Sequence, residues 1–164
     1  MSQHPYDTLA LSQGGKLIFT PCPGTKEADL ESSVSQLKEA GADAIVTMMP
    51  DDEMAQFNAQ AIPELCEKLG MNWFQLPVGD DAPPAEAFDA ALAEQKQNIV
   101  DIVKQGGSIA IHCRGGSGRT GFMAAITLIE LGHSIEDAFE QVKGIRPKSL
   151  KLQPHIDFIN KAYA

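Results

Sequence analysis

The sequence predicts an α/β fold with a mostly parallel central sheet of about four to five strands, flanked by helices. The first observation is that short apolar runs alternate with longer segments in which apolar residues recur at helical spacing. Such alternation favours a parallel sheet, because each helix carries the chain back to the edge where the next strand begins. The second observation is size, since 164 residues of which 43% are hydrophobic suffice for one domain with a real core. We therefore expect residues 1–164 to form a single compact domain.

The predicted strands are short apolar runs that end at turn-forming residues. They cover residues 17–19, 44–48, 73–76 and 109–111. The run at 44–48 is apolar throughout, which is typical of a strand buried on both faces. Residues 1–15 are polar and contain the pair Gly14-Gly15, so we expect a loop there.

The predicted helices are the segments whose apolar residues lie three and four positions apart. They are expected over 27–40, over 50–69 with an interruption near Pro63, over 85–105, over 122–131 and from 134 to a break at 145–147. A last helix is expected to carry Ile156, Ile159 and Tyr163. Apolar residues nearly surround the 122–131 helix, which predicts that it is the central buried helix. Ser134 is followed three residues later by Asp137, the spacing of an N-cap.

The charge balance and the cysteine pattern narrow the possible partners. A net charge of −9 disfavours binding to nucleic acid or to an anionic membrane. No apolar run approaches the roughly 20 residues of a membrane span, and we recognise no signal peptide or lipid anchor.

Cys22, Cys66 and Cys113 are too few and too far apart for a disulfide framework, and their spacing shows no zinc pattern. We expect a cytoplasmic protein, monomeric and without a metal or another cofactor.

The most informative stretch is the glycine-rich segment 112–121, which follows a predicted strand and opens a predicted helix. Its sequence is HCRGGSGRTG. The glycines let the backbone turn its N–H groups inward as an anion-binding nest, and the helix N-terminus adds its own free N–H groups. Arg119 adds a planar guanidinium that suits two oxygens of one phosphate. We expect a phosphate cradle formed by Arg114, Gly115, Gly116, Ser117, Gly118 and Arg119.

Cys113 opens this loop, where the field that favours phosphate also favours a thiolate. The sequence therefore predicts that Cys113 is an ionised nucleophile at the floor of the cradle. Thr120 is placed to hydrogen-bond the sulfur and to ease its later departure from phosphorus. His112 is expected to order the loop through hydrogen bonds, although a plainly packed histidine fits the sequence nearly as well.

A thiolate that attacks phosphorus needs an acid to protonate the departing oxygen. Asp80 and Asp81 are the candidates, on a 77–84 loop that leaves the carboxyl end of a predicted strand. The glycine-rich loop leaves the carboxyl end of another strand, and ligands of such sheets bind at that edge. We expect the two loops to share one crevice. A solvated turn is the alternative interpretation of these aspartates.

The glycine spacing also allows a second interpretation. Residues 116–121 fit the G-x-G-x-x-G fingerprint of dinucleotide-binding proteins. That interpretation fails because no strand is predicted after the helix, where the ribose-binding acid would lie, and because Cys113 and Arg119 would have no role. A nucleotide-binding P-loop is excluded because no Gly-Lys-Ser/Thr follows the glycines.

The pattern His-Cys-x-x-Gly-x-x-Arg-Thr-Gly is similar to the signature of the cysteine-dependent protein tyrosine and dual-specificity phosphatases. The 77–84 loop resembles the general-acid loop of the small members, and its register Asp-x-x-x-Pro selects Asp80 over Asp81. Pro23-Gly24-Thr25-Lys26 resembles the entry to the first helix in the cyclin-dependent-kinase-associated phosphatase group. Gln153 resembles a family glutamine that helps to position the hydrolytic water.

This resemblance implies a protein tyrosine phosphatase-like fold and a phosphomonoesterase that needs no metal. It implies that Cys113 attacks the phosphate of a phosphorylated protein or peptide, that Arg119 holds the phosphoryl group, and that water hydrolyses a phosphocysteine intermediate. Phosphotyrosine is the first expected substrate, with phosphoserine and phosphothreonine in addition.

Three alternatives stay open at this point. A phosphoinositide phosphatase of the same fold often carries extra lysines in the cradle, where this chain has only Arg114 in addition. A binding module would recognise phosphate without turnover. Arsenate reduction or sulfur transfer would need Cys22 or Cys66 close to Cys113.

Overall fold

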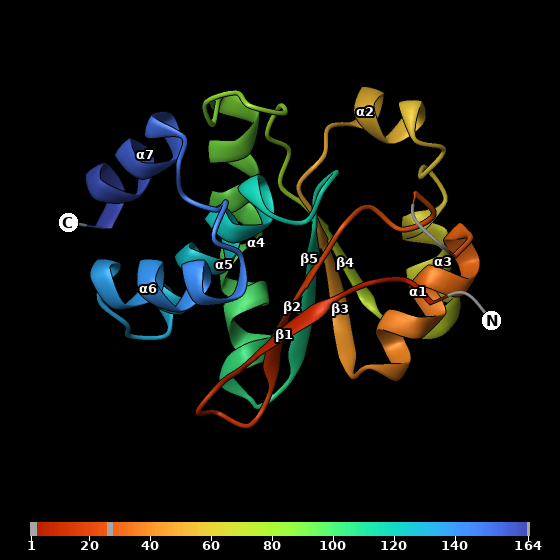
Figure 1. The fold of residues 1–164 in the computed structure, drawn as a ribbon. Coiled ribbons are helices and arrows are strands. Elements are labelled where there is room, and N and C mark those ends of the chain that lie inside the picture. Colours follow the sequence, from red (N-terminus) through yellow and green to blue (C-terminus); the bar gives the residue numbers. More distant parts are fainter. Residues whose placement is uncertain (1–2, 26–27, 164) are drawn as a thin grey trace.

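A five-stranded sheet forms the centre of the protein (Figure 1). The computed structural model describes residues 3–25 and 28–163. The strands are β1 (Asp7–Ala10), β2 (Lys16–Thr20), β3 (Ala42–Thr47), β4 (Asn72–Gln75) and β5 (Ser108–His112), in the order β1-β2-β5-β3-β4. The strands β2, β5, β3 and β4 are parallel, and β1 pairs antiparallel with β2. The predicted α/β fold with a mostly parallel sheet is confirmed.

Helices cover both faces of the sheet (Figure 1). They are α1 (Leu30–Glu39), α2 (Asp51–Gln56), α3 (Ile62–Leu69), α4 (Glu86–Lys104), α5 (Gly118–Glu130), α6 (Ile135–Ile145) and α7 (Gln153–Tyr163). One face carries α1 and α3, and the other carries α4 and α5, with α6 and α7 packed outside α5. Each face of the sheet buries its own apolar cluster.

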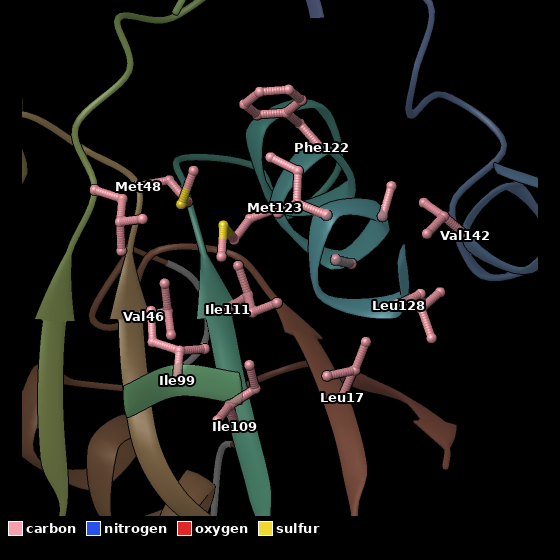
Figure 2. Packing of buried hydrophobic residues seen from close by; sticks show 14 of the residues in the cluster. Leu17, Val46, Met48, Ile99, Ile109, Ile111, Phe122, Met123, Leu128 and Val142 are labelled. Carbon is pink, nitrogen blue, oxygen red and sulfur yellow. The ribbon is translucent and has the colours of Figure 1, made fainter. Parts of the chain in front are cut away.

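The contact between β5 and α5 positions the predicted cradle. All five residues of β5 are buried, as suits a central parallel strand. Figure 2 shows Met123 of α5 close to Ile111 of β5 within the larger cluster. The helix is buried from Arg119 to Leu128, which confirms the expectation of a central buried helix. The loop between these two rigid elements therefore starts and ends at fixed points.

The expectation that residues 1–15 form a loop is wrong for the segment that forms β1. Three of its four residues are exposed, so the sequence shows no apolar alternation there. Backbone pairing with β2 and an ion pair between Asp7 and Arg146 hold this edge strand in place. Neither interaction leaves a periodic signal in the sequence.

Several helix ends also differ from the expectation. The first helix begins at Leu30, because the Asp29 side chain caps it by accepting a hydrogen bond from the Ser32 amide at 2.8 Å. The expected interruption of the 50–69 helix is present but lies before Pro63, between the end of α2 at Gln56 and the start of α3 at Ile62. Pro63 lies in the first turn of α3, where its missing N–H breaks no helical hydrogen bond. Lys26 of the resemblance and position 27, the expected start of the first helix, lie outside the described residues.

Within residues 3–25 and 28–163, no helix combines the length and the apolar character that crossing a bilayer requires. Ser134 caps α6 as predicted, since its side chain accepts a hydrogen bond from the Asp137 amide. That helix ends at Ile145, at the predicted break.

Candidate active site

Three segments meet at the carboxyl edge of the sheet, each following a parallel strand. They are the loop from β5 to α5, the turn from β4 to α4, and α2, which follows β3. Together with residues after β2 and between α6 and α7, they line a cavity of about 760 Å³. Its lining includes Asp80, Asp81, Cys113, Arg114, Gly115, Ser117, Gly118 and Arg119. The structure thus brings the predicted nucleophile, the predicted acids and the predicted cradle to one crevice.

Cys113 lies at the floor of this cavity and is 3% exposed. Its sulfur accepts hydrogen bonds from the Gly116 amide at 3.3 Å and from the Thr120 hydroxyl at 3.2 Å. The Gly116 amide belongs to the loop, and the Thr120 hydroxyl belongs to the first turn of α5. They stabilise negative charge on the sulfur, which is the form that acts as a nucleophile and as a leaving group.

The loop carbonyls point away from the cavity and are held there from outside. The donors are the Cys22 amide on Arg114 O at 3.1 Å, Arg146 Nε on Gly116 O at 3.0 Å, and Ser149 Oγ on Ser117 O at 2.7 Å. Buried carbonyls need such partners, because an unpaired polar group is costly. With these carbonyls fixed outward, the loop can turn amide N–H groups toward an anion.

Gly116 in the loop and Gly121 in the first turn of α5 are required by close approach. Gly116 has a φ of +82°, and a Cβ there would lie 2.7 Å from the Thr20 carbonyl carbon. A Cβ at Gly121 would lie 2.2 Å from Ser149 Oγ. A side chain at either position would push the loop away from the segments that hold its carbonyls.

His112 is buried at the start of the loop, and both of its ring nitrogens have hydrogen-bond partners. Its Nδ1 lies 3.2 Å from the carbonyl of Cys113, which can only accept, so Nδ1 carries the hydrogen. Thr47 Oγ1 accepts from Trp73 Nε1 at 2.8 Å and donates to His112 Nε2 at 2.8 Å. Burial lowers the pKa of His112 to about 4, so the ring is neutral near pH 7.

Arg119 contacts groups from two other segments of the site. Its guanidinium is 2% exposed and makes a two-pronged pair with Glu53, at 2.6 Å and 2.7 Å. It also donates to the Val78 carbonyl at 2.8 Å and lies 3.5 Å from Asp80 Oδ1. Burial opposes the charge, but Glu53, Cys113 and Asp80 outweigh it and raise the pKa of the guanidinium.

The Asp80–Asp81 turn follows β4 and is closed by a hydrogen bond from the Ala82 amide to Gly79 O at 3.1 Å. Both aspartates are exposed, but Asp80 Oδ1 lies 3.5 Å from the Arg119 guanidinium, whereas Asp81 has a φ of +55°. The geometry therefore favours Asp80 as the group nearest a phosphate held by Arg119, in agreement with the register of the resemblance.

Two predicted residues occupy other positions than the cradle itself. The Arg114 guanidinium lies over the Phe57 ring, 5.3 Å from its centroid, at the cavity wall. Gln153 begins α7, and its side-chain amide donates to Asp157 at 2.8 Å. Its proposed role toward the hydrolytic water stays a prediction.

Four residues of the site were not predicted: Glu53, Arg146, Ser149 and His155. Glu53 had a usable signal, because it follows the 44–48 strand and so lies at the same sheet edge as the two loops. Arg146 and Ser149 act through single contacts to loop carbonyls, which no sequence pattern marks. His155 on α7 approaches the Ala82 carbonyl, far from it in sequence.

The other two cysteines are buried. Cys22 lies beside the loop, and burial raises the pKa of its thiol to about 12, with Glu53 and Cys113 adding to the rise. Cys66 lies in α3 and belongs, like Cys22, to the apolar cluster on the face of the sheet that does not include Cys113. Burial raises the pKa of its thiol to about 12 as well. No cluster of three or more potential metal ligands occurs in the part of the chain that the structure describes.

Residues 23–133, about two thirds of the chain, match the family model described as "Polymorphic toxin system, DSP-PTPase phosphatase". The chain belongs to this phosphatase family. The matched range contains Cys113, Arg119, Asp80 and Glu53. It ends before α6 and α7, so Arg146, Ser149 and His155 lie outside it.

Curated relatives of this DSP-PTPase phosphatase are named as phosphatases or as a kinase inhibitor. A probable protein tyrosine phosphatase type IVA B from Dictyostelium discoideum is 31% identical over 64% of this chain and 58% of its own length. Protein tyrosine phosphatase type IVA 3 from Bos taurus is 30% identical over 71% and 62%, and human cyclin-dependent kinase inhibitor 3 is 25% identical over 76% and 60%. The chain thus spans about three fifths of the length of these relatives.

Solved structures share the fold. Kinase associated phosphatase aligns with a TM-score of 0.79 at 21% identity, covering 99% of this chain and 97% of its own. Tk-PTP in its active form aligns with a TM-score of 0.69 at 24% identity, covering 88% and 89%. The expected protein tyrosine phosphatase-like fold is thereby confirmed.

We predict that Glu53→Gln lowers the free energy of unfolding by about 3 kcal/mol, because it removes the carboxylate that makes the two-pronged pair with the buried Arg119 charge. Urea unfolding measures this change. The matched control is Glu31→Gln, which removes an exposed ion pair with Lys68 whose side chains are 67% and 68% exposed, and should change stability by less than about 1 kcal/mol. Equal effects of the two substitutions would contradict the role given to Glu53.

Proposed function

We propose that the protein is a phosphomonoesterase that hydrolyses phosphotyrosine, and in addition phosphoserine and phosphothreonine, in proteins. One observation carries this proposal. The Cys113 sulfur, with two hydrogen-bond donors, shares one cavity with the Arg119 guanidinium and the Asp80 carboxyl group. A nucleophile, an oxyanion-binding cation and an acid are the three groups that this chemistry requires.

In the first step, a sulfur lone pair of Cys113 forms a bond to phosphorus while the ester P–O bond breaks. Asp80, protonated at this stage, transfers its proton to the departing oxygen, and an alcohol or phenol leaves. Arg119 and the inward N–H groups hold the phosphoryl oxygens. The product is a phosphocysteine, with Asp80 now a carboxylate.

In the second step, water attacks phosphorus and gives a proton to the Asp80 carboxylate. The P–S bond breaks, and the electron pair returns to sulfur as a thiolate. The Thr120 hydroxyl stabilises this leaving group at 3.2 Å. Inorganic phosphate leaves, and the site returns to its starting state.

The cavity walls support an aromatic phosphate ester as the first substrate. Phe57 and Leu152 contribute apolar surface to the lining, and Arg114 lies against Phe57. These groups can contact a phenyl ring whose phosphate lies in the cradle. Lys148 and Arg114 also offer positive charge at the wall, so a phosphoinositide belongs in the test panel.

The proposal extends to the setting of the enzyme. A thiol nucleophile works only while it is reduced, which favours the cytoplasm. A monomer is sufficient, because all the site residues named here come from one chain. Residues 1–164 act as one catalytic domain in this proposal, since Asp7 near one end pairs with Arg146, which holds the loop carbonyl of Gly116.

Thiol chemistry with a second cysteine is less well supported. Cys22 lies beside the loop, but a thiol with a pKa of about 12 is almost fully protonated at pH 7 and reacts slowly. Asp80 also has no role in such a reaction.

We expect the wild-type protein to hydrolyse phosphotyrosine peptides, and Cys113→Ser to lose at least about a thousandfold in kcat/KM because an alcohol replaces the thiolate. Phosphate release from phosphotyrosine, phosphoserine, phosphothreonine and phosphoinositide substrates measures this. Calorimetry on Cys113→Ser should still detect phosphopeptide binding. Binding by the wild type without phosphate release would instead establish a recognition module, and a preference for the inositide would redirect the substrate assignment.

The two aspartates can be separated by matched substitutions. Asp80→Asn should lower kcat/KM for phenyl phosphate by on the order of a hundredfold, since phenolate leaves poorly without a proton. Asp81→Asn is the control, because asparagine tolerates the positive φ of 55° at that position, and we expect less than about a threefold change. The reverse ranking would assign the acid to Asp81.

A further inference from the structure

His155 is a buried histidine on α7 that the proposed reaction does not use. It lies against the acid turn, the segment 78–82 that contains Asp80 and Asp81. It is 1% exposed, and its Nε2 lies 3.2 Å from the Ala82 carbonyl oxygen. A carbonyl only accepts, so Nε2 carries the hydrogen and donates it. Burial lowers the pKa of His155 below its usual value, so the ring is neutral near pH 7.

The position of the His155 ring is fixed by aromatic packing. It stacks on Phe122 of α5, with 4.6 Å between ring centroids and 27° between the planes. Phe158, one turn further along α7, packs edge-on against Phe122 and against Phe88 of α4. This cluster connects α4, α5 and α7, so the helix that bears His155 is held against the helix that bears Arg119.

The acid turn is therefore held on both sides of Asp80 and Asp81. On one side, Arg119 donates to the Val78 carbonyl at 2.8 Å. On the other side, His155 donates to the Ala82 carbonyl. Arg119 must also bind the phosphate of the substrate, whereas His155 has no role in substrate binding. His155 thus supplies a hold on the turn that is independent of the substrate.

We propose that His155 is a positioning residue that keeps Asp80 over the cradle before and during phosphoryl transfer. This inference deepens the proposed phosphatase function and rests on it. It makes a selective prediction, because only substrates with poor leaving groups need the acid. A residue that merely stabilises the fold would affect all substrates alike.

The test compares two esters and three variants. His155→Phe keeps a ring that can stack on Phe122 but removes the donor, whereas His155→Gln places an amide N–H near the position of Nε2. His155→Phe should lower kcat/KM for phenyl phosphate roughly tenfold and leave dinitrophenyl phosphate within about twofold. His155→Gln and the control His133→Gln, which replaces a half-buried histidine at the start of α6, should stay within about twofold of wild type on both esters.

A double-mutant cycle isolates the path through the acid. In an Asp80→Asn background, His155→Phe should cause no further loss on phenyl phosphate. Equal losses on both esters, no loss on either, or a further full loss in the Asp80→Asn background would each overturn the inference.

Hydrogen exchange gives a readout that needs no turnover. Amides of residues 78–82 should exchange about fivefold faster in His155→Phe, the effect of losing one hydrogen bond, and at the wild-type rate in His155→Gln and His133→Gln. Unchanged exchange in His155→Phe would overturn the inference. If the wild type hydrolyses neither ester, the proposed function fails, and the exchange result alone decides whether His155 holds the turn.

Discussion

The buried guanidinium of Arg119 is the constraint on which the rest of the site depends. An arginine that is 2% exposed must be surrounded by acceptors, because an uncompensated buried charge costs several kcal/mol. The acceptors come from two different crossovers of the sheet, Glu53 after β3 and the Val78 carbonyl after β4. The same charge thereby fixes α2, the acid turn and the phosphate loop relative to one another, and it leaves Asp80 at the edge of the cradle.

The second requirement is that the carbonyl groups of the loop accept hydrogen bonds from outside the loop. Its N–H groups can face an anion only if its carbonyls are satisfied elsewhere. Cys22, Arg146 and Ser149 provide that support from segments on either side of the loop in sequence. Arg146 also pairs with Asp7, so the edge strand β1 reinforces the loop from a distance. The local sequence 112–121 therefore determines the shape of the cradle, and contacts from distant segments stabilise that shape.

The parts of the site that could be predicted are those with local chemistry. The loop shows its glycines, Cys113 and Arg119 within one short segment, and Asp80 lies at the end of a recognisable strand. The supporting residues are different, because a contact such as Ser149 to Ser117 joins the turn between α6 and α7 to the start of α5 and has no spacing rule. Glu53 lies between these cases, since the strand order would have shown that its helix starts at the same sheet edge. The edge strand β1 was missed because its exposed residues carry no apolar alternation.

The proposed reaction requires that the Cys113 sulfur form a covalent bond to phosphorus. Rapid quenching of Asp80→Asn with radiolabelled dinitrophenyl phosphate tests it most directly, because this ester needs no acid to form the intermediate and the variant lacks the base that hydrolyses it. We expect about one labelled phosphate per chain, found by peptide mass spectrometry on Cys113 and absent from Cys113→Ser. Label on another residue, or turnover without any covalent label, would contradict it.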